Sequence, residues 1–191
     1  MSDPLTERLN HILPKVTSDE FLSGKGLGNE IAFYIFDYPP EEELRIRAHI
    51  AFLQDLIPKQ RPGLRVAHIN LLDFVIEHLR QRELLDKAIE LQKTKGDAFV
   101  LKQLATLLHP NKLAPAFAEV AQPDRHNLVL VSGVGSVYPM LRAHSLLNNL
   151  HAIMGQTPLV LFYPGRYDGQ ALRLFGKLKN DHYYRAFTLV P

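Results

Sequence analysis

Three short runs of consecutive apolar residues constrain the fold of this chain more than any other feature. Residues 31–37 read IAFYIFD, residues 128–132 read LVLVS and residues 158–163 read PLVLFY. A strand with one wet face alternates apolar and polar residues, whereas a strand covered on both faces is apolar throughout. Two further strands are predicted at residues 64–72 and 183–190. The pattern therefore predicts a mostly parallel five-stranded sheet with helices on both of its faces.

Segments with helical spacing alternate with these strands. A short amphipathic helix over residues 3–13, with Asp3 as its N-cap, is expected to dock on the body of the fold. A second helix is predicted from Glu41 to about Ile57, where Pro58 ends it. Its apolar face is expected to consist of Leu44, Ala48, Ala51, Phe52 and Leu56. Further helices are predicted over residues 73–91, 98–108, 111–122 and 137–155. We expect residues 1–191 to form a single α/β domain.

Composition excludes several classes of protein. Apolar residues make up 46% and charged residues 22% of the chain, which is typical of a globular protein. Because the chain contains no cysteine, it has no disulfide, no zinc–thiolate site and no cysteine nucleophile. No leader-like segment or stretch long enough to span a bilayer is recognisable. We therefore expect a cytoplasmic protein without a membrane partner.

Nucleotide binding is not supported by the sequence. The stretch SGKGLG, residues 23–28, has Asp19 where a P-loop needs its first glycine and Gly26 where it needs serine or threonine. It also precedes the first strand, whereas ligands bind at the carboxyl ends of parallel strands. After that strand the chain is acidic, from Asp37 to Glu43, and acidic groups repel phosphate. We predict a P-loop-like three-layer architecture that lacks a functional phosphate loop, with no cofactor.

Two loops carry the candidate binding residues. The stretch SGVGSVYP at residues 132–139 is either an anion or ligand loop or a tight turn that needs glycine, and we favour the turn. Its candidate residues are Ser132, Gly133, Gly135 and Ser136. The loop predicted over residues 163–176 is a candidate partner-binding site. The alternative is that Arg166 and Asp168 pair with each other and only order the loop. Its candidate residues are Tyr163, Arg166, Tyr167, Asp168, Gln170 and Arg173, with the two tyrosines as anchors.

Motifs for catalysis and for metal binding are not found in the sequence. The nucleophile elbow Gly-x-Ser-x-Gly does not occur, and the nine histidines show no HExxH or His-x-His spacing. We therefore predict no catalytic residues and no metal ligands.

Four segments together resemble the BrxB family of BREX (bacteriophage exclusion) systems. They are GLGNEIAFYIFDYPPEEELRIR at 26–47, VSGVGSVYPMLRAHSLLNNL at 131–150, LVLFYPGRYDGQALRLFG at 159–176 and YYRAF at 183–187. The resemblance implies a role in antiviral defence, beside a DNA methyltransferase, an ATPase and the alkaline-phosphatase-like protein PglZ. It supplies no catalytic residue, so it favours a scaffold.

Three hypotheses for the function follow. The preferred one is a non-enzymatic adaptor that binds PglZ, and other BREX components with it, and reaches nucleic acid only indirectly. The alternative is an enzyme that handles a small ligand or nucleotide at the carboxyl edge of the sheet, through Asp37, Ser136, Arg166 and Asp168. The third is direct contact with DNA through the basic residues of the C-terminal third, which are Arg166, Arg173, Lys177, Lys179 and Arg185. A deep pocket lined by the four residues of the enzyme hypothesis would favour that hypothesis.

Overall fold

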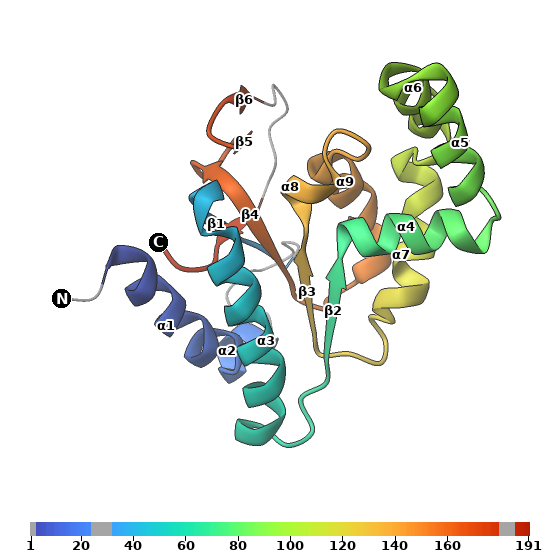
Figure 1. The fold of residues 1–191 in the computed structure, drawn as a ribbon. Coiled ribbons are helices and arrows are strands. Elements are labelled where there is room, and N and C mark those ends of the chain that lie inside the picture. Colours follow the sequence, from blue (N-terminus) through green and yellow to red (C-terminus); the bar gives the residue numbers. More distant parts are fainter. Residues whose placement is uncertain (1–2, 24–31, 180–185) are drawn as a thin grey trace.

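Five parallel strands form the centre of the molecule. The computed structural model describes residues 3–23, 32–179 and 186–191 (Figure 1). The parallel strands lie in the order β2-β3-β4-β1-β7. Their bounds are β1 Phe33–Tyr38, β2 Val66–Asn70, β3 Leu128–Ser132, β4 Leu159–Tyr167 and β7 Phe187–Thr188. The predicted parallel sheet of five strands is confirmed, and its relation to P-loop proteins stays a prediction.

Helices cover both faces of the sheet, as predicted. Along β1, Phe33 and Ile35 pack into one apolar core, while Tyr34 and Phe36 pack into another on the opposite face. Helices α1, α2 and α3 cover the second core, and the remaining helices lie on the other side (Figure 1). The bounds are α1 Pro4–Val16, α2 Asp19–Ser23, α3 Glu43–Gln60, α4 Leu71–Gln81, α5 Leu85–Lys95, α6 Asp97–Leu107, α7 Pro110–Ala121, α8 Val134–Val137 and α9 Ala143–Met154.

The buried face of α3 differs from the predicted one. The helix continues through Pro58 to Gln60, and it buries four β-branched or leucine side chains, which are Ile46, Ile50, Leu53 and Ile57. The predicted face is largely exposed, with Leu44 at 77% and Phe52 at 48% of full exposure. Both sets have helical spacing, so periodicity alone could not choose between them.

Two helices predicted as continuous are interrupted. The helix predicted over residues 73–91 breaks into α4 and α5, because Glu83 adopts a left-handed conformation with φ of 57°. The N–H of Leu84 bonds to the carbonyl of Leu79 and the N–H of Glu83 bonds to that of Arg80, which closes a Schellman motif. Glycine usually occupies this position, so its absence concealed the break. The helix predicted over residues 137–155 is interrupted near Pro139: α8 ends at Val137 and α9 begins at Ala143.

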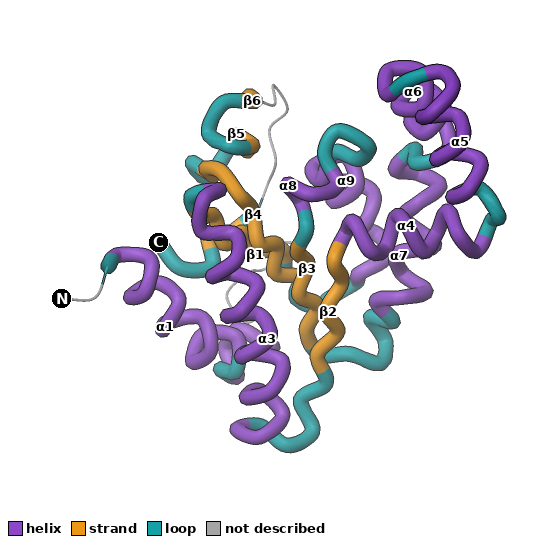
Figure 2. The backbone as a smooth tube through the Cα atoms, viewed as in Figure 1, coloured by secondary structure: helices purple, strands orange, loops and turns teal. Residues whose placement is uncertain are grey.

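The segment predicted as a loop over residues 163–176 is mostly strand. Strand β4 continues to Tyr167 and pairs antiparallel with β5, Leu172–Leu174, which pairs in turn with β6, Leu178–Lys179. This hairpin extends beyond the carboxyl ends of the parallel strands (Figure 2). Most of the predicted glycine loop at 23–28 lies outside the described residues, as does the start of the predicted last strand at 183–185.

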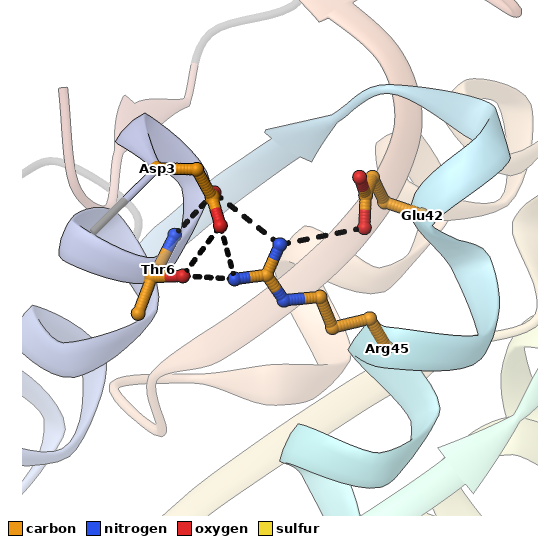
Figure 3. Close-up of polar contacts among 4 residues, drawn as sticks. All are labelled: Asp3, Thr6, Glu42 and Arg45. Atoms are coloured by element: carbon orange, nitrogen blue, oxygen red, sulfur yellow. Dashed lines mark hydrogen bonds and ion pairs between the residues drawn. The ribbon is translucent and has the colours of Figure 1, made fainter. Parts of the chain in front are cut away.

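Helix α1 docks through its N-cap, as its predicted role requires. The Asp3 carboxylate accepts hydrogen bonds from the backbone N–H of Thr6 at 3.0 Å and from its hydroxyl at 2.7 Å. Arg45 on α3 forms an ion pair with the same carboxylate at 2.9 Å, contacts the Thr6 hydroxyl and reaches Glu42 at 3.5 Å (Figure 3). These donors, Arg45 first and then Thr6, lower the pKa of Asp3.

A second connection joins both ends of the chain to β1. The Arg8 guanidinium on α1 pairs with the Asp37 carboxylate at 2.8 Å and donates to the Asp37 carbonyl at 2.8 Å. It also donates to the carbonyl of Val190 at 3.0 Å and lies over the Phe36 ring, 4.6 Å from its centroid. The second Asp37 oxygen accepts from the backbone N–H of Tyr167 at 2.9 Å. One ion pair thus connects α1, β1, β4 and the C-terminal residues.

The depressed pKa of Asp3 predicts a pH dependence of α1 docking. Because the folded pKa lies below the ordinary value of 3.8, the ionised form stabilises the fold above that value, and this contribution is lost as the pH falls through the folded pKa. We expect Asp3 to remain ionised at about pH 3 in a carboxyl NMR titration. Arg45→Met should raise the pKa of Asp3 toward 3.8, whereas Arg125→Met should not move it. An ordinary Asp3 pKa in the unmodified chain would refute the contact.

The central ion pair predicts a large effect of a single substitution. Arg8→Met keeps the length of the side chain but leaves the Asp37 carboxylate and the Val190 carbonyl without their cation. We expect a loss of about 2–3 kcal/mol in the free energy of unfolding, measured with urea. The matched control is Arg125→Met, an exposed arginine for which the described residues provide no ion pair, and its effect should stay within about 0.5 kcal/mol. Equal losses in both variants would contradict the proposed role of Arg8.

Candidate functional site

The carboxyl ends of the parallel strands bring the candidate residues to one edge of the sheet. Strand β1 ends at Tyr38, β2 at Asn70 and β3 at Ser132, and β4 passes this edge at Tyr163. Ligands of open α/β sheets bind at this edge, because the loops and the helix N-termini meet there. Whether a site exists here depends on which polar groups of the edge remain unpaired.

The loop after β3 is a tight turn whose polar side chains are already paired. Gly133 has a φ of 75°, and a Cβ there would lie 2.3 Å from the side-chain oxygen of Asn70. Asn70 in turn caps α4 by accepting from the N–H of Leu72 at 3.0 Å. The Ser132 hydroxyl bonds to His68 at 2.8 Å, and burial lowers the pKa of that histidine. The glycine thus serves the packing of a helix cap.

The second half of this loop also faces protein groups. A Cβ at Gly135 would lie 3.0 Å from the ring of Phe175. The Ser136 hydroxyl accepts a hydrogen bond from Arg47 on α3 at 3.0 Å. Helix α8, which follows Gly133, has only four residues, so it offers little dipole to an anion. The candidate anion residues therefore contact other parts of the same chain.

A network of hydrogen bonds and one ion pair occupies the position after β1 where a phosphate loop would lie. The Tyr38 hydroxyl donates to the Glu43 carboxylate, which also accepts from Arg47 at 2.9 Å. Burial first, and then Glu43, raise the pKa of Tyr38. Arg47 extends the network to Ser136. The acidic stretch that contains Tyr38 and Glu43 was recognised in the sequence, but the ion pair of Glu43 with Arg47 was not, although their four-residue spacing is a recognised helical ion-pair signal.

The β4–β5 hairpin carries the exposed polar candidates. Arg166 and Arg173 lie directly opposite each other in the antiparallel register, and both are exposed. Asp168 accepts from the N–H groups of Ala171 at 2.8 Å and Gln170 at 3.1 Å, and these bonds lower its pKa. Asp168 also lies 3.7 Å from Arg173. Its partner across the turn is therefore Arg173, and the alternative pairing with Arg166 is not seen among the described contacts.

The two tyrosines of this segment are buried. Tyr167 is 8% exposed, and its hydroxyl donates to the carbonyl of Ala186 at 2.7 Å. Tyr163 is 2% exposed, and its hydroxyl has no hydrogen-bond partner among the described residues. Burial raises the pKa of Tyr163. The two tyrosines predicted as interface anchors are therefore part of the buried core. The exposed surface of the hairpin consists of Arg166, Asp168, Gln170 and Arg173.

The four residues of the enzyme hypothesis have separate partners. Asp37 pairs with Arg8, Ser136 bonds to Arg47, and Asp168 orders its own turn. Arg166 is exposed on the hairpin. No hydrogen bond or ion pair joins any two of these four residues within the described part of the chain. Three of the four residues are therefore held by structural contacts, and Arg166 faces solvent on the hairpin.

Within residues 3–23, 32–179 and 186–191, no three histidine, aspartate or glutamate side chains gather closely enough to hold a metal ion. Among the helices of the same ranges, none combines the length and the hydropathy needed to cross a bilayer.

Comparison with known proteins identifies similar chains. The family model described as BREX protein BrxB matches residues 67–189. A BREX protein BrxB of Bacillus cereus (strain H3081.97) is 41% identical over 190 residues, which is 97% of each chain. A BREX protein BrxB of Escherichia coli O9:H4 (strain HS) is 36% identical over 192 residues, 100% of this chain and 94% of the relative. No solved structure matches the chain.

The two buried tyrosines predict opposite effects of the same substitution. Tyr163→Phe removes a hydroxyl that has no partner among the described residues, so the free energy of unfolding should stay constant or rise by up to about 1 kcal/mol. Tyr167→Phe removes the bonds to Ala186 and should cost about 1–2 kcal/mol. Urea unfolding of both variants tests this pair. A clear loss in Tyr163→Phe would mean that its hydroxyl has a partner in the folded chain.

Proposed function

The chain belongs to the BrxB family of BREX proteins, a family of phage-defence components, and on this premise we propose that it is a non-enzymatic adaptor. Its partners in this proposal are other BREX components, and the PglZ-type protein is the first of them. The role is cytoplasmic, in keeping with a chain that contains no cysteine. Assembly requires a recognition surface and no catalytic group.

The exposed arginine pair on the β4–β5 hairpin is the observation that carries this proposal. Directly opposite residues of an antiparallel pair project from the same face, and like charges at such positions destabilise the sheet. Arg166 faces Arg173 in this way, and only Arg173 has an acidic neighbour, Asp168, among the described residues. An acidic surface on a partner would relieve this repulsion. Arginine also suits interfaces because its planar group binds carboxylates with two parallel hydrogen bonds.

The polar side chains at the carboxyl edge of the sheet are already held by other groups of the chain, which supports an adaptor over an enzyme. A catalytic group needs a free lone pair or proton directed at a substrate. Asp37, Ser136 and Asp168 are instead held by Arg8, Arg47 and backbone N–H groups. The Glu43 carboxylate is likewise held, by the Tyr38 hydroxyl and by Arg47.

The test is co-purification of the tagged chain with the PglZ protein of the same operon. The double variant Arg166→Ala/Arg173→Ala should weaken the complex at least about tenfold, since charged hydrogen bonds contribute roughly 1.5–3 kcal/mol each. The same variant should leave the isolated protein as stable or slightly more stable, because it removes a repulsion between opposed charges. These opposite effects separate a lost interface from a damaged fold.

A matched control is the double variant Arg82→Ala/Arg125→Ala, which removes two exposed arginines from other surfaces. It should leave the complex unchanged. Should the chain form no complex with PglZ or with any other BREX component, the adaptor proposal fails. Equal weakening by both double variants would remove the hairpin as the interface. Binding to DNA that falls steeply as salt rises would instead favour direct DNA contact.

A further inference from the structure

A cavity of about 190 Å³ lies between the start of α9, the middle of β4 and the β5–β6 hairpin. Tyr163, Arg142 and Lys177 are among its lining residues. We propose that this cavity binds a carboxylate carried on a short apolar group. The proposal does not depend on the adaptor role, because it concerns a pocket of the isolated chain.

The Tyr163 hydroxyl is the first argument for a ligand. Buried tyrosine hydroxyls almost always have a hydrogen-bond partner, because an unpaired one loses its hydration without compensation. Tyr163 is only 2% exposed and lines the cavity. Its hydroxyl has no hydrogen-bond partner among the described residues. A ligand oxygen in the cavity would provide the missing acceptor.

The charge around the cavity is the second argument. Arg142, Ala143 and His144 line it at the N-terminus of α9, a helix of 12 residues whose N-cap has no side-chain hydrogen bond. The first N–H groups of such a helix carry partial positive charge. Arg142 and Lys177 add two cations without ion pairs to the described residues, and no acidic side chain of those ranges lines the cavity. The site therefore favours an anion.

The walls and the size of the cavity define the rest of the ligand. Apolar side chains form much of the lining, from Val134, Leu141, Leu174 and Leu178. A volume of 190 Å³ holds roughly six water-sized groups, below the roughly 300 Å³ at which pockets begin to accept drug-sized ligands. A nucleotide is too large. A carboxylate on a short branched alkyl group fits the volume, and Arg142 can bind its two oxygens side by side.

The sequence offered residues 132–136 as an anion loop or a tight turn, with the turn favoured. In the structure these residues lead into the four-residue α8, and the cavity lies at the start of the next helix. The longer helix begins at Ala143, after a helical pattern that Pro139 interrupts. Only the packing of the hairpin against this helix start creates a cavity, so no local sequence pattern could have located it.

The direct test uses isovalerate, the anion of 3-methylbutanoic acid, as the probe. Titration of the full chain, followed by amide NMR shifts, should give saturable binding with a Kd of about 0.1–1 mM, as expected for a ligand of so few atoms. The neutral isovaleramide has the same shape and should bind at least about tenfold more weakly, because it lacks the charge.

Variants locate the binding site. Tyr163→Phe and Arg142→Gln should each weaken isovalerate about tenfold, since each removes a hydrogen bond to a charged group. Arg125→Gln, an exposed arginine away from the cavity lining, should bind it like the unmodified chain. Circular dichroism of each variant checks that it is folded, and Tyr163→Phe is expected to fold because it removes no described hydrogen bond.

A comparison with peptides distinguishes two sources of the carboxylate, the C-terminus of a protein chain and a small free acid. A short peptide that ends in leucine with a free carboxylate is compared with its amidated form and with isovalerate. If the free-carboxylate peptide binds about tenfold more tightly than isovalerate, the natural ligand is the C-terminus of a protein chain. If it does not, the ligand is a small free acid. In the first case the amidated peptide must bind more weakly than the free-carboxylate peptide.

Three results would overturn the proposal. The first is the absence of saturable binding of isovalerate and of the peptide up to about 10 mM. The second is equal binding of isovalerate and isovaleramide, which would mean that the cavity does not recognise charge. The third is unchanged binding in Tyr163→Phe and Arg142→Gln, which would place the bound probe elsewhere on the chain.

Discussion

The ion pair of Arg8 with Asp37 is the interaction on which the arrangement of the sheet edge depends. A carboxylate that is only 19% exposed at the end of a buried strand is costly unless it is paired and hydrogen-bonded. Arg8 and the N–H of Tyr167 meet this requirement together, and Arg8 also binds the carbonyl of Val190. The same contacts therefore attach α1, the extension of β4 and the chain end to β1. An aspartate that looks catalytic from its position thus serves the fold.

The extension of β4 explains why the candidate residues separate into two groups. Beyond Pro164 the strand leaves its parallel neighbours and pairs with β5, and successive side chains along it face opposite ways. Tyr163 and Tyr167 are buried, whereas Arg166 faces solvent opposite Arg173. One segment thereby supplies the exposed surface of the proposed adaptor and one wall of the proposed carboxylate cavity. The two proposals concern opposite faces of the same hairpin and can be tested separately.

Much of the site could not be predicted from the sequence, because its contacts join distant segments. The glycine at 133 indicated a tight turn, which is confirmed by its φ of 75°, but the reason for it is the side chain of Asn70, 63 positions earlier. The bond between Arg47 and Ser136 and the bond between His68 and Ser132 likewise follow no local spacing. Arg142 and Lys177 have no distinguishing pattern at all. Their shared cavity exists only because the hairpin packs against the start of α9.

The sequence by itself determined the fold class, the five parallel strands and the position of most helices, because continuous apolar runs require burial on both faces. It also determined that the position after β1 is acidic. Tertiary structure decided which of two apolar stripes of α3 is buried, since Leu44 and Ile46 belong to stripes with equal helical spacing. It also decided where α4 ends, because Glu83 adopts a conformation that its own side chain does not favour. Local pattern specifies which groups need burial or pairing, and only the packed chain specifies their partners.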